Sequence, residues 1–225
     1  MPLLQKRRWH QFDSQTLLVQ AALKYVVDTA QQAIDLRGCF RVVLSGGHSP
    51  RGLYRALREI KTDWSVWHIY LADERCLPVD HPERNSHLIQ TLWLDQVPIP
   101  SAQIHLIAAE GEPKLAAILY AQLLANVAAF DLVVLGLGTD GHTASLFPHG
   151  RLDERMPCAF PVCDAPEPAA YRVTLSAARL SKSRQVIFLV DGEEKRYALK
   201  LWREGVAIPA SQICPIAGVD IFCSE

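Results

Sequence analysis

Short, continuous apolar runs alternate along this chain with segments of helical periodicity, and this alternation limits the possible folds more than any other feature. Residues 40–44, 131–135 and 185–190 are rich in Val, Leu, Ile and Phe and lack the period of two that marks a half-exposed strand. Each run is therefore predicted to be a strand buried on both faces. Such strands, separated by helices, are typical of a parallel sheet that helices cover on both sides. The sequence predicts an open, doubly wound, mostly parallel α/β fold of the Rossmann-like kind.

The other elements follow without repeats or long linkers, so residues 1–225 are expected to form a single domain. Apolar residues at three-and-four spacing predict a helix over 17–37 that Gly38 ends, preceded by a frayed, basic N-terminal segment without a strand. Ser49 is expected to cap a helix that begins at Pro50 and runs to Arg58. The Pro-rich stretch 157–168 is interpreted as an irregular surface excursion. The remaining predictions are strands over 66–72, 104–107, 171–175 and 219–223 and helices over 86–94, 113–129 and 193–204.

The charge balance excludes partners that select for bulk charge. The 225 residues carry 23 Lys and Arg against 24 Asp and Glu, a net charge of 23 − 24 = −1, whereas nucleic-acid and membrane-surface binders usually have a basic excess. No apolar run approaches the roughly 20 residues of a membrane span, and the first ten residues lack the apolar core of a secretion signal. The six cysteines are scattered without a C-x-x-C pair and are expected to be reduced. We therefore expect a cytoplasmic protein; the sequence does not predict its oligomeric state.

Four polar loops follow predicted strands: residues 45–49, 73–75, 136–143 and 191–195. In open parallel sheets, ligands bind outside the carboxyl ends of the strands. Because these loops also carry the most reactive side chains of the chain, they are expected to form a small-molecule site together.

Gly46 and Gly47 lie between a predicted strand and a predicted helix, where backbone N–H groups can bind an anion. A simple tight turn is the alternative interpretation of the pair. The loop is not a nucleotide P-loop, because Leu53 and Tyr54 stand where Lys and Ser or Thr are required.

Glycines 136, 138 and 141 satisfy the pattern G-x-G-x-x-G, but Pro148 and Gly150 shorten the segment in which a dinucleotide-binding helix would have to begin. Asp140 and His142 flank Gly141 in this loop. A neutral imidazole there can take a proton from water, although a hydrogen-bonded loop histidine is the more common explanation of such a residue taken alone.

Three parts of the chain point to one known family: the run Asp73-Glu74-Arg75, Asn85, and residues 136–148, which read GLGTDGHTASLFP. They resemble the glucosamine-6-phosphate isomerase/6-phosphogluconolactonase family, and specifically its lactonases. The resemblance covers nearly the whole chain. It implies a fold like that of glucosamine-6-phosphate deaminase and hydrolysis of 6-phospho-D-glucono-1,5-lactone to 6-phosphogluconate in the oxidative pentose phosphate pathway. The implied partner is this small phosphorylated sugar lactone, and neither a metal nor an organic cofactor is implied.

The resemblance also implies residue roles. His142 would activate water, with Asp140 orienting the imidazole or contacting sugar hydroxyls. His48 departs from the family loop, which commonly reads Ser-Gly-Gly-Ser-Thr-Pro. The substrate- and phosphate-binding residues implied are Ser45, Gly46, Gly47, His48, Ser49, Asp73, Arg75, Asn85, Arg172 and Lys195.

Two other functions stay open at this point. A glucosamine-6-phosphate deaminase-like enzyme would carry an acidic residue where this chain has Phe147. A non-catalytic sugar-phosphate-binding domain of a regulator would need a DNA-binding module, and only 39 residues precede the first predicted strand. His48, Asp73, Glu74 and His142 show no compelling metal-ligand spacing, so no metal is predicted.

Overall fold

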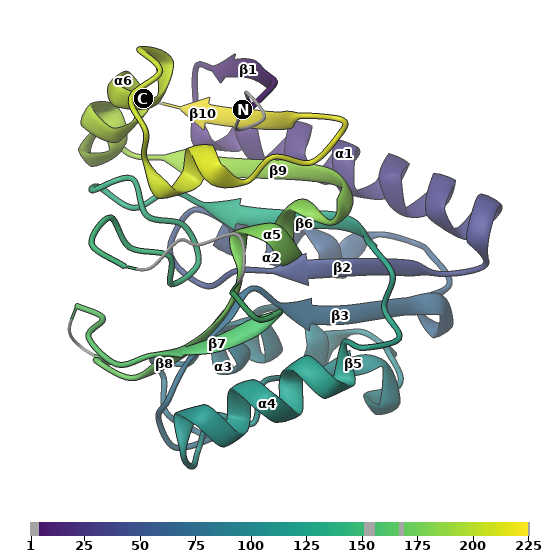
Figure 1. Cartoon of the computed structure of the whole chain (residues 1–225). Helices are drawn as coiled ribbons and strands as arrows, with labels where there is room; N and C mark the ends of the chain where they lie inside the picture. Colours follow the sequence, from purple (N-terminus) through teal and green to yellow (C-terminus); the bar gives the residue numbers. More distant parts are fainter. Residues whose placement is uncertain (1–4, 151–155, 167–168, 225) are drawn as a thin grey trace.

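The central sheet is parallel throughout, and its strands stand in the spatial order β1-β10-β9-β6-β2-β3-β5 (Figure 1). The structure is a computed structural model that describes residues 5–150, 156–166 and 169–224. The strands of this sheet are β1 (Arg7–Phe12), β2 (Phe40–Leu44), β3 (Trp67–Leu71), β5 (Ile104–His105), β6 (Phe130–Gly136), β9 (Ser183–Asp191) and β10 (Val219–Ser224).

Helices lie on both faces of the sheet, as the doubly wound prediction requires. Helix α1 packs along β1, β2, β6, β9 and β10 on one face, and Figure 1 shows α4 and α5 in front of the opposite face. Ser14 caps α1 through a bond from the Leu17 N–H, and Gly38 ends it with φ +73°. The helices are α1 (Gln15–Arg37), α2 (Arg51–Ala56), α3 (Asn85–Leu92), α4 (Pro113–Leu123), α5 (Ala177–Ser181) and α6 (Arg196–Arg203).

A second, antiparallel sheet has the order β4-β8-β7, with β4 (Asp73–Arg75), β7 (Ala159–Val162) and β8 (Arg172–Leu175). The prediction of a loop at 73–75 is therefore wrong, and so is the prediction of an irregular excursion where β7 lies; residues 167–168 of that stretch fall outside the described residues. Both strands are too short for a periodicity signal, and their pairing with β8 stabilises them. This small sheet brings Asp73, Arg75 and Arg172 to one side of the main sheet.

Strand β1 is the largest difference from the sequence-based fold, which placed a frayed segment there and the first strand at residue 40. It pairs in parallel with β10, and the Arg8 side chain forms two hydrogen bonds, at 2.8 and 2.7 Å, with the buried Asp220 carboxylate. Because β1 is a half-exposed edge strand, its polar residues carry no buried-strand pattern. The first strand therefore begins at Arg7 and not at Phe40. The expectation that 39 residues precede the first strand, which counted against a regulator with a DNA-binding module, is wrong.

Smaller differences concern helix ends. Pro50 rather than Ser49 occupies the N-cap of α2, and no side chain caps that helix. Helix α4 ends at Leu123 rather than at 129, and the predicted helix 193–204 divides into a 3₁₀ turn over Glu193–Lys195 followed by α6. The helices predicted over 17–37 and 86–94 match α1 and α3 within two residues.

The carboxyl ends of the central strands meet at one edge of the sheet. Leu44 at the end of β2 is in register with Leu71 at the end of β3, and Gly136 at the end of β6 is in register with Leu189 near the end of β9. The loops that follow these strands therefore converge, as expected of a parallel sheet.

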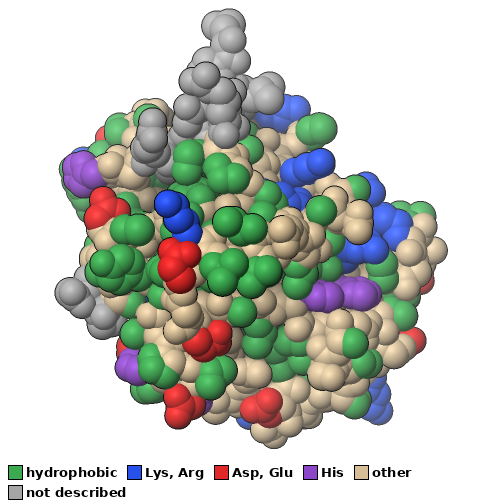
Figure 2. Space-filling model, turned by 60° about the horizontal axis from the view of Figure 1, so that its bottom comes forward, with side chains coloured by type: hydrophobic (Ala, Val, Ile, Leu, Met, Phe, Trp, Pro, Cys, Tyr) green, Lys and Arg blue, Asp and Glu red, His purple; other side chains and the backbone are tan. Residues whose placement is uncertain are grey.

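On its outer side, α4 exposes Leu115, Ile118, Leu119 and Leu123, and Figure 2 shows hydrophobic side chains across the middle of this side of the molecule. In the part of the chain that the structure describes, no helix combines the length and apolarity that a membrane span requires.

Candidate active site

One pocket of about 240 Å³ lies where the four predicted loops converge. Eleven of the twelve predicted site residues line it, and Asp140 lies behind His142, lining a neighbouring cavity. The exposed fraction of these residues differs widely, because Ser45, Ser49, Asp73, Asn85 and Arg172 are buried whereas Gly47 and His48 are exposed. The pocket-lining residues predicted from sequence are Ser45, Gly46, Gly47, His48, Ser49, Asp73, Arg75, Asn85, His142, Arg172 and Lys195.

Asp140 orients the His142 imidazole. Its Oδ1 lies 2.5 Å from His142 Nδ1 and accepts a 3.1 Å hydrogen bond from the His142 backbone N–H. Burial opposes ionisation of this carboxyl, but the bonds from His142 outweigh it and hold the pKa of Asp140 below its ordinary value. A carboxylate at Nδ1 favours the tautomer with its proton on that nitrogen, which leaves the Nε2 lone pair to accept a proton.

The imidazole lies directly against the backbone of Gly138. A Cβ atom on that residue would stand 2.0 Å from His142 Nδ1, closer than any real contact. On another side, the Phe147 ring packs against the imidazole with centroids 4.9 Å apart. Gly138, Phe147 and Asp140 thus restrict the imidazole to one orientation.

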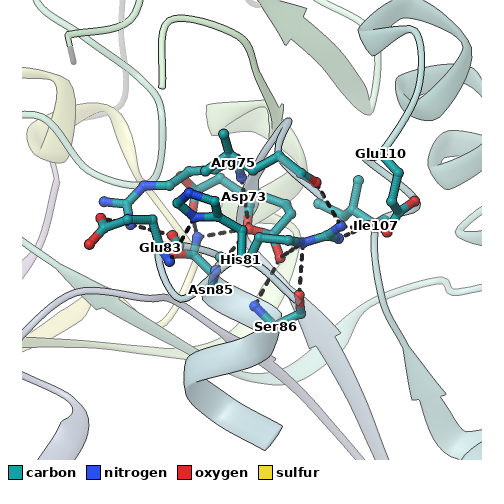
Figure 3. Close-up of polar contacts among 11 residues, drawn as sticks. Asp73, Arg75, His81, Glu83, Asn85, Ser86, Ile107 and Glu110 are labelled. Carbon is teal, nitrogen blue, oxygen red and sulfur yellow. Dashed lines mark hydrogen bonds and ion pairs between the residues drawn. The ribbon is translucent and has the colours of Figure 1, made fainter. Parts of the chain in front are cut away.

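Asn85 joins the loop over residues 45–49 to β4. Its Nδ2 donates hydrogen bonds of 3.0 Å to both the backbone oxygen and Oδ1 of Asp73 (Figure 3). Its amide packs so closely on Gly46 that a Cβ there would lie 1.8 Å from Asn85 Oδ1. The Ser145 hydroxyl donates a 2.6 Å bond to the other Asp73 oxygen. Asp73 is therefore a buried carboxylate with both oxygens occupied.

Three cations face the pocket. Arg75 Nη1 binds the backbone oxygen of Glu83 and lies 3.0 Å from Glu83 Oε2 (Figure 3), so this residue braces the segment between β4 and α3 as well as lining the pocket. Burial lowers the pKa of Arg172, opposed by the Asp73 carboxylate, and the guanidinium stays charged at neutral pH. Lys195 completes the set from the turn after β9.

Two donors at the pocket have no hydrogen-bond partner among the described residues: Ser45 Oγ and Arg75 Nε, both buried. A buried donor without a partner costs about 1 to 3 kcal/mol, and both atoms belong to residues that line the pocket. The pocket thus brings together two donors without partners, three cations and an oriented imidazole.

Sequence reasoning gave no individual role to several residues of this site. Thr143, Ala144 and Glu194 line the pocket, and Ser145 supports Asp73 from below it. Ala144 has φ +48° and is the one non-glycine residue of the described ranges in the left-handed region, where an alanine is strained. The run from Thr143 to Ser145 lies inside the motif over residues 136–148, but the motif alone assigns no role to these three residues.

Within the described ranges, no group of three or more His, Cys, Asp or Glu side chains is arranged to hold a metal ion. The expectation of a reaction without metal remains a prediction.

Fold and pocket together define a class: an α/β protein that binds a small anionic ligand at the carboxyl edge of a parallel sheet. The family model for glucosamine-6-phosphate isomerases and 6-phosphogluconolactonase matches residues 13–222. The chain belongs to this family.

Relatives within the family narrow the comparison further. A 6-phosphogluconolactonase of Synechocystis is 37% identical over 195 residues, covering 81% of this chain and 79% of the relative. The 6-phosphogluconolactonase of Mycobacterium leprae is 37% identical over 221 residues, covering 92% and 88%. Among solved structures, the 6-phosphogluconolactonase of Thermotoga maritima superposes with a TM-score of 0.90 at 26% identity, covering 98% of this chain and 100% of that one. A monomeric glucosamine-6-phosphate deaminase shares the fold, with a TM-score of 0.86 at 17% identity over 97% of each chain.

Proposed function

We propose that this protein is a 6-phosphogluconolactonase that hydrolyses 6-phospho-D-glucono-1,5-lactone to 6-phosphogluconate, the reaction of the oxidative pentose phosphate pathway. The observation that carries the proposal is the Asp140–His142 pair, whose imidazole lines the same pocket as three cations and two residues with unpartnered donors. The relatives named 6-phosphogluconolactonase support it at 37% identity over most of the chain.

The substrate's phosphate binds at the side of the pocket formed by Ser45, the Gly46–Gly47 amides, Arg75 and Lys195. Arginine and lysine side chains and backbone N–H groups are the usual phosphate ligands of proteins. The phosphate is distant from C1, the atom that reacts. Its binding holds the C1 carbonyl near His142, so that binding energy from a non-reacting part of the substrate orients the reacting atoms.

His142 acts as the general base. Its Nε2 takes a proton from water while the water oxygen forms a bond to C1, and the carbonyl electron pair moves onto oxygen. When this tetrahedral intermediate collapses, the bond from C1 to the ring oxygen breaks, and the proton passes from the imidazole to the leaving oxygen. Asp140 stabilises the imidazolium that exists between the two proton transfers. A δ-lactone is an activated ester, so no nucleophilic serine is required.

One feature favours the lactonase over a deaminase-like enzyme. The side chain packed on the imidazole is Phe147, an apolar ring rather than a carboxylate. The proposed location is the cytoplasm, which fits six cysteines that, all within the described residues, form no disulfide.

The test is a side-by-side assay of two substrates. Freshly prepared 6-phosphogluconolactone should open faster with the protein than spontaneously, and a chelator should not change the rate. Glucosamine 6-phosphate should release no ammonia; its release would favour the deaminase, and binding without turnover of either compound would favour a non-catalytic sugar-phosphate-binding domain.

His142→Ala should lower kcat by about two orders of magnitude or more, since a positioned general base contributes about 10²- to 10⁴-fold. The half-buried His87, which lies outside the pocket, is replaced in His87→Ala as a histidine control. Full activity of His142→Ala would remove His142 from the proposed mechanism.

A further inference from the structure

Glu74 is a completely buried glutamate that lies in β4 between two pocket residues, Asp73 and Arg75. Successive side chains of a strand point to opposite faces, so Glu74 points away from the pocket that its neighbours line. A buried carboxylate is costly unless it is paired and hydrogen-bonded.

Its partners are backbone N–H groups of the binding residues themselves. Oε1 accepts hydrogen bonds from the N–H groups of Arg75 and Asn85 at 2.7 and 2.8 Å, and Oε2 accepts one from Ser86 at 2.8 Å. Asn85 and Ser86 are the first residues of α3, whose N–H groups have no acceptor within the helix. The residue at the N-cap of α3, Arg84, makes no side-chain cap bond. Glu74 therefore caps α3 from a neighbouring strand.

This cap sets the position of Asn85 relative to the rest of the pocket. With its backbone N–H held by Glu74, Asn85 bonds Asp73 through its side chain and packs on Gly46. One carboxylate thus fixes the relative positions of β4, the start of α3 and, through Asn85, the loop over residues 45–49.

Arg84 compensates the charge of Glu74 on the side away from the pocket. Its Nε lies 3.4 Å from Glu74 Oε2 and 3.1 Å from the Ser86 hydroxyl, and its Nη2 donates a 3.0 Å bond to the backbone oxygen of Ile107. Its Nη1 also contacts Glu110, a carboxylate that is 42% exposed (Figure 3). Glu110 shares the same arginine but bonds no backbone group of a pocket residue in these contacts.

We propose that Glu74 is a positioning residue for substrate binding: its buried carboxylate holds Arg75 and Asn85 in the arrangement that receives the phosphorylated substrate. This inference rests on the proposed lactonase function. Asp140 and His142 belong to a different loop, and none of the bonds of Glu74 reaches them. Loss of the carboxylate should therefore affect binding more than the chemical step.

The variant that tests the inference is Glu74→Gln. Glutamine keeps the size of the side chain but offers one acceptor oxygen and a donating NH₂ group, so the cap loses an acceptor for at least one N–H. We expect KM for the lactone to rise about tenfold or more while kcat changes less than about threefold, the pattern of lost uniform binding. The matched control is Glu110→Gln, which removes the other carboxylate of Arg84 and should leave KM within about twofold.

Glu74→Gln leaves Arg84 with less compensation and so lowers stability. The double variant Glu74→Gln/Arg84→Met removes the buried charge as well, and it should recover the melting temperature while its KM stays high. Rapid amide exchange at Asn85 and Ser86 in both variants would further support the cap. An unchanged KM in either folded variant, or an equal rise in KM in Glu110→Gln, would overturn the inference.

A second readout separates this inference from the proposed function. Calorimetric titration with 6-phosphogluconate measures binding without catalysis, and Glu74→Gln should weaken it about as much as it raises KM. Wild-type protein that binds this ligand but does not open the lactone refutes the proposed function, and the affinity ratio still decides the role of Glu74. Wild-type protein that does not bind it refutes both.

Discussion

Gly138→Ala is the most direct test of the imidazole position, because Gly138 differs from alanine only by the atom that the imidazole excludes. The added Cβ would stand 2.0 Å from His142 Nδ1, whereas ordinary contact begins at 3.4 Å, so the ring must move by about 1.4 Å. The φ angle of Gly138 lies outside the left-handed region, so the backbone accepts alanine without strain.

A displacement of this size has a large expected effect on rate. Misplacing a reacting group by about 1 Å can cost about 10²-fold, equivalent to about 2.7 kcal/mol in the barrier. We expect kcat for the lactone to fall about a hundredfold in Gly138→Ala, while KM changes little because the phosphate side of the pocket is untouched.

The assay couples product formation to a 6-phosphogluconate-dependent dehydrogenase and subtracts spontaneous lactone opening. Gly111→Ala is the matched control, because a Cβ at that glycine meets nothing within 4 Å and its φ is also ordinary. Folding of each variant is checked by circular dichroism. If folded Gly138→Ala keeps kcat within threefold of wild type, the imidazole orientation described above is not the catalytic one.

Two further predictions concern binding and stability. Gly46→Ala places a Cβ 1.8 Å from Asn85 Oδ1 and should raise KM more than it lowers kcat in the same assay, and an unchanged KM would contradict the role of Asn85. For Asp220, burial opposes ionisation, but bonds from Arg8, His10 and Tyr25 outweigh it and lower its pKa below the ordinary 3.8. Because the pKa of Asp220 is lower in the folded state, its ionised carboxylate stabilises the fold above pH 3.8, and this stabilisation is lost as the pH falls through the folded-state pKa. The melting temperature of Asp220→Asn should therefore lie below that of wild type at pH 7. This difference should shrink below pH 3.8, and a constant difference from pH 7 to pH 3 would contradict the assignment.

The sequence also located β3, β8 and β10 within one residue, but the most secure strand predictions are those for which burial leaves one choice. Strands β2, β6 and β9 are continuous apolar runs, and a run of that kind at the centre of an α/β chain has to be covered on both faces. Once they are placed, the convergence of the polar loops follows from parallel geometry. This is why so many predicted site residues line one pocket.

Features that depend on partners distant in sequence could not be read from local pattern. Strand β1 contains Arg7 and Arg8 and is stabilised by β10, and β7 contains Pro161 and is stabilised by β8. The bond from Ser145 to Asp73 joins residues that are 72 positions apart. Glu74 had no visible role in the sequence because its function lies entirely in backbone groups that the fold brings to it.

The pairing of β1 with β10 has a consequence for synthesis on the ribosome. Arg8 and Asp220 are 212 residues apart in the chain, so β1 leaves the ribosome long before the strand that completes its hydrogen bonds exists. During that interval β1 is an unpaired strand, and charged residues on such a strand suppress association with other nascent chains. The basic run Lys6-Arg7-Arg8 thus keeps the unpaired strand soluble until β10 is synthesised and pairs with β1.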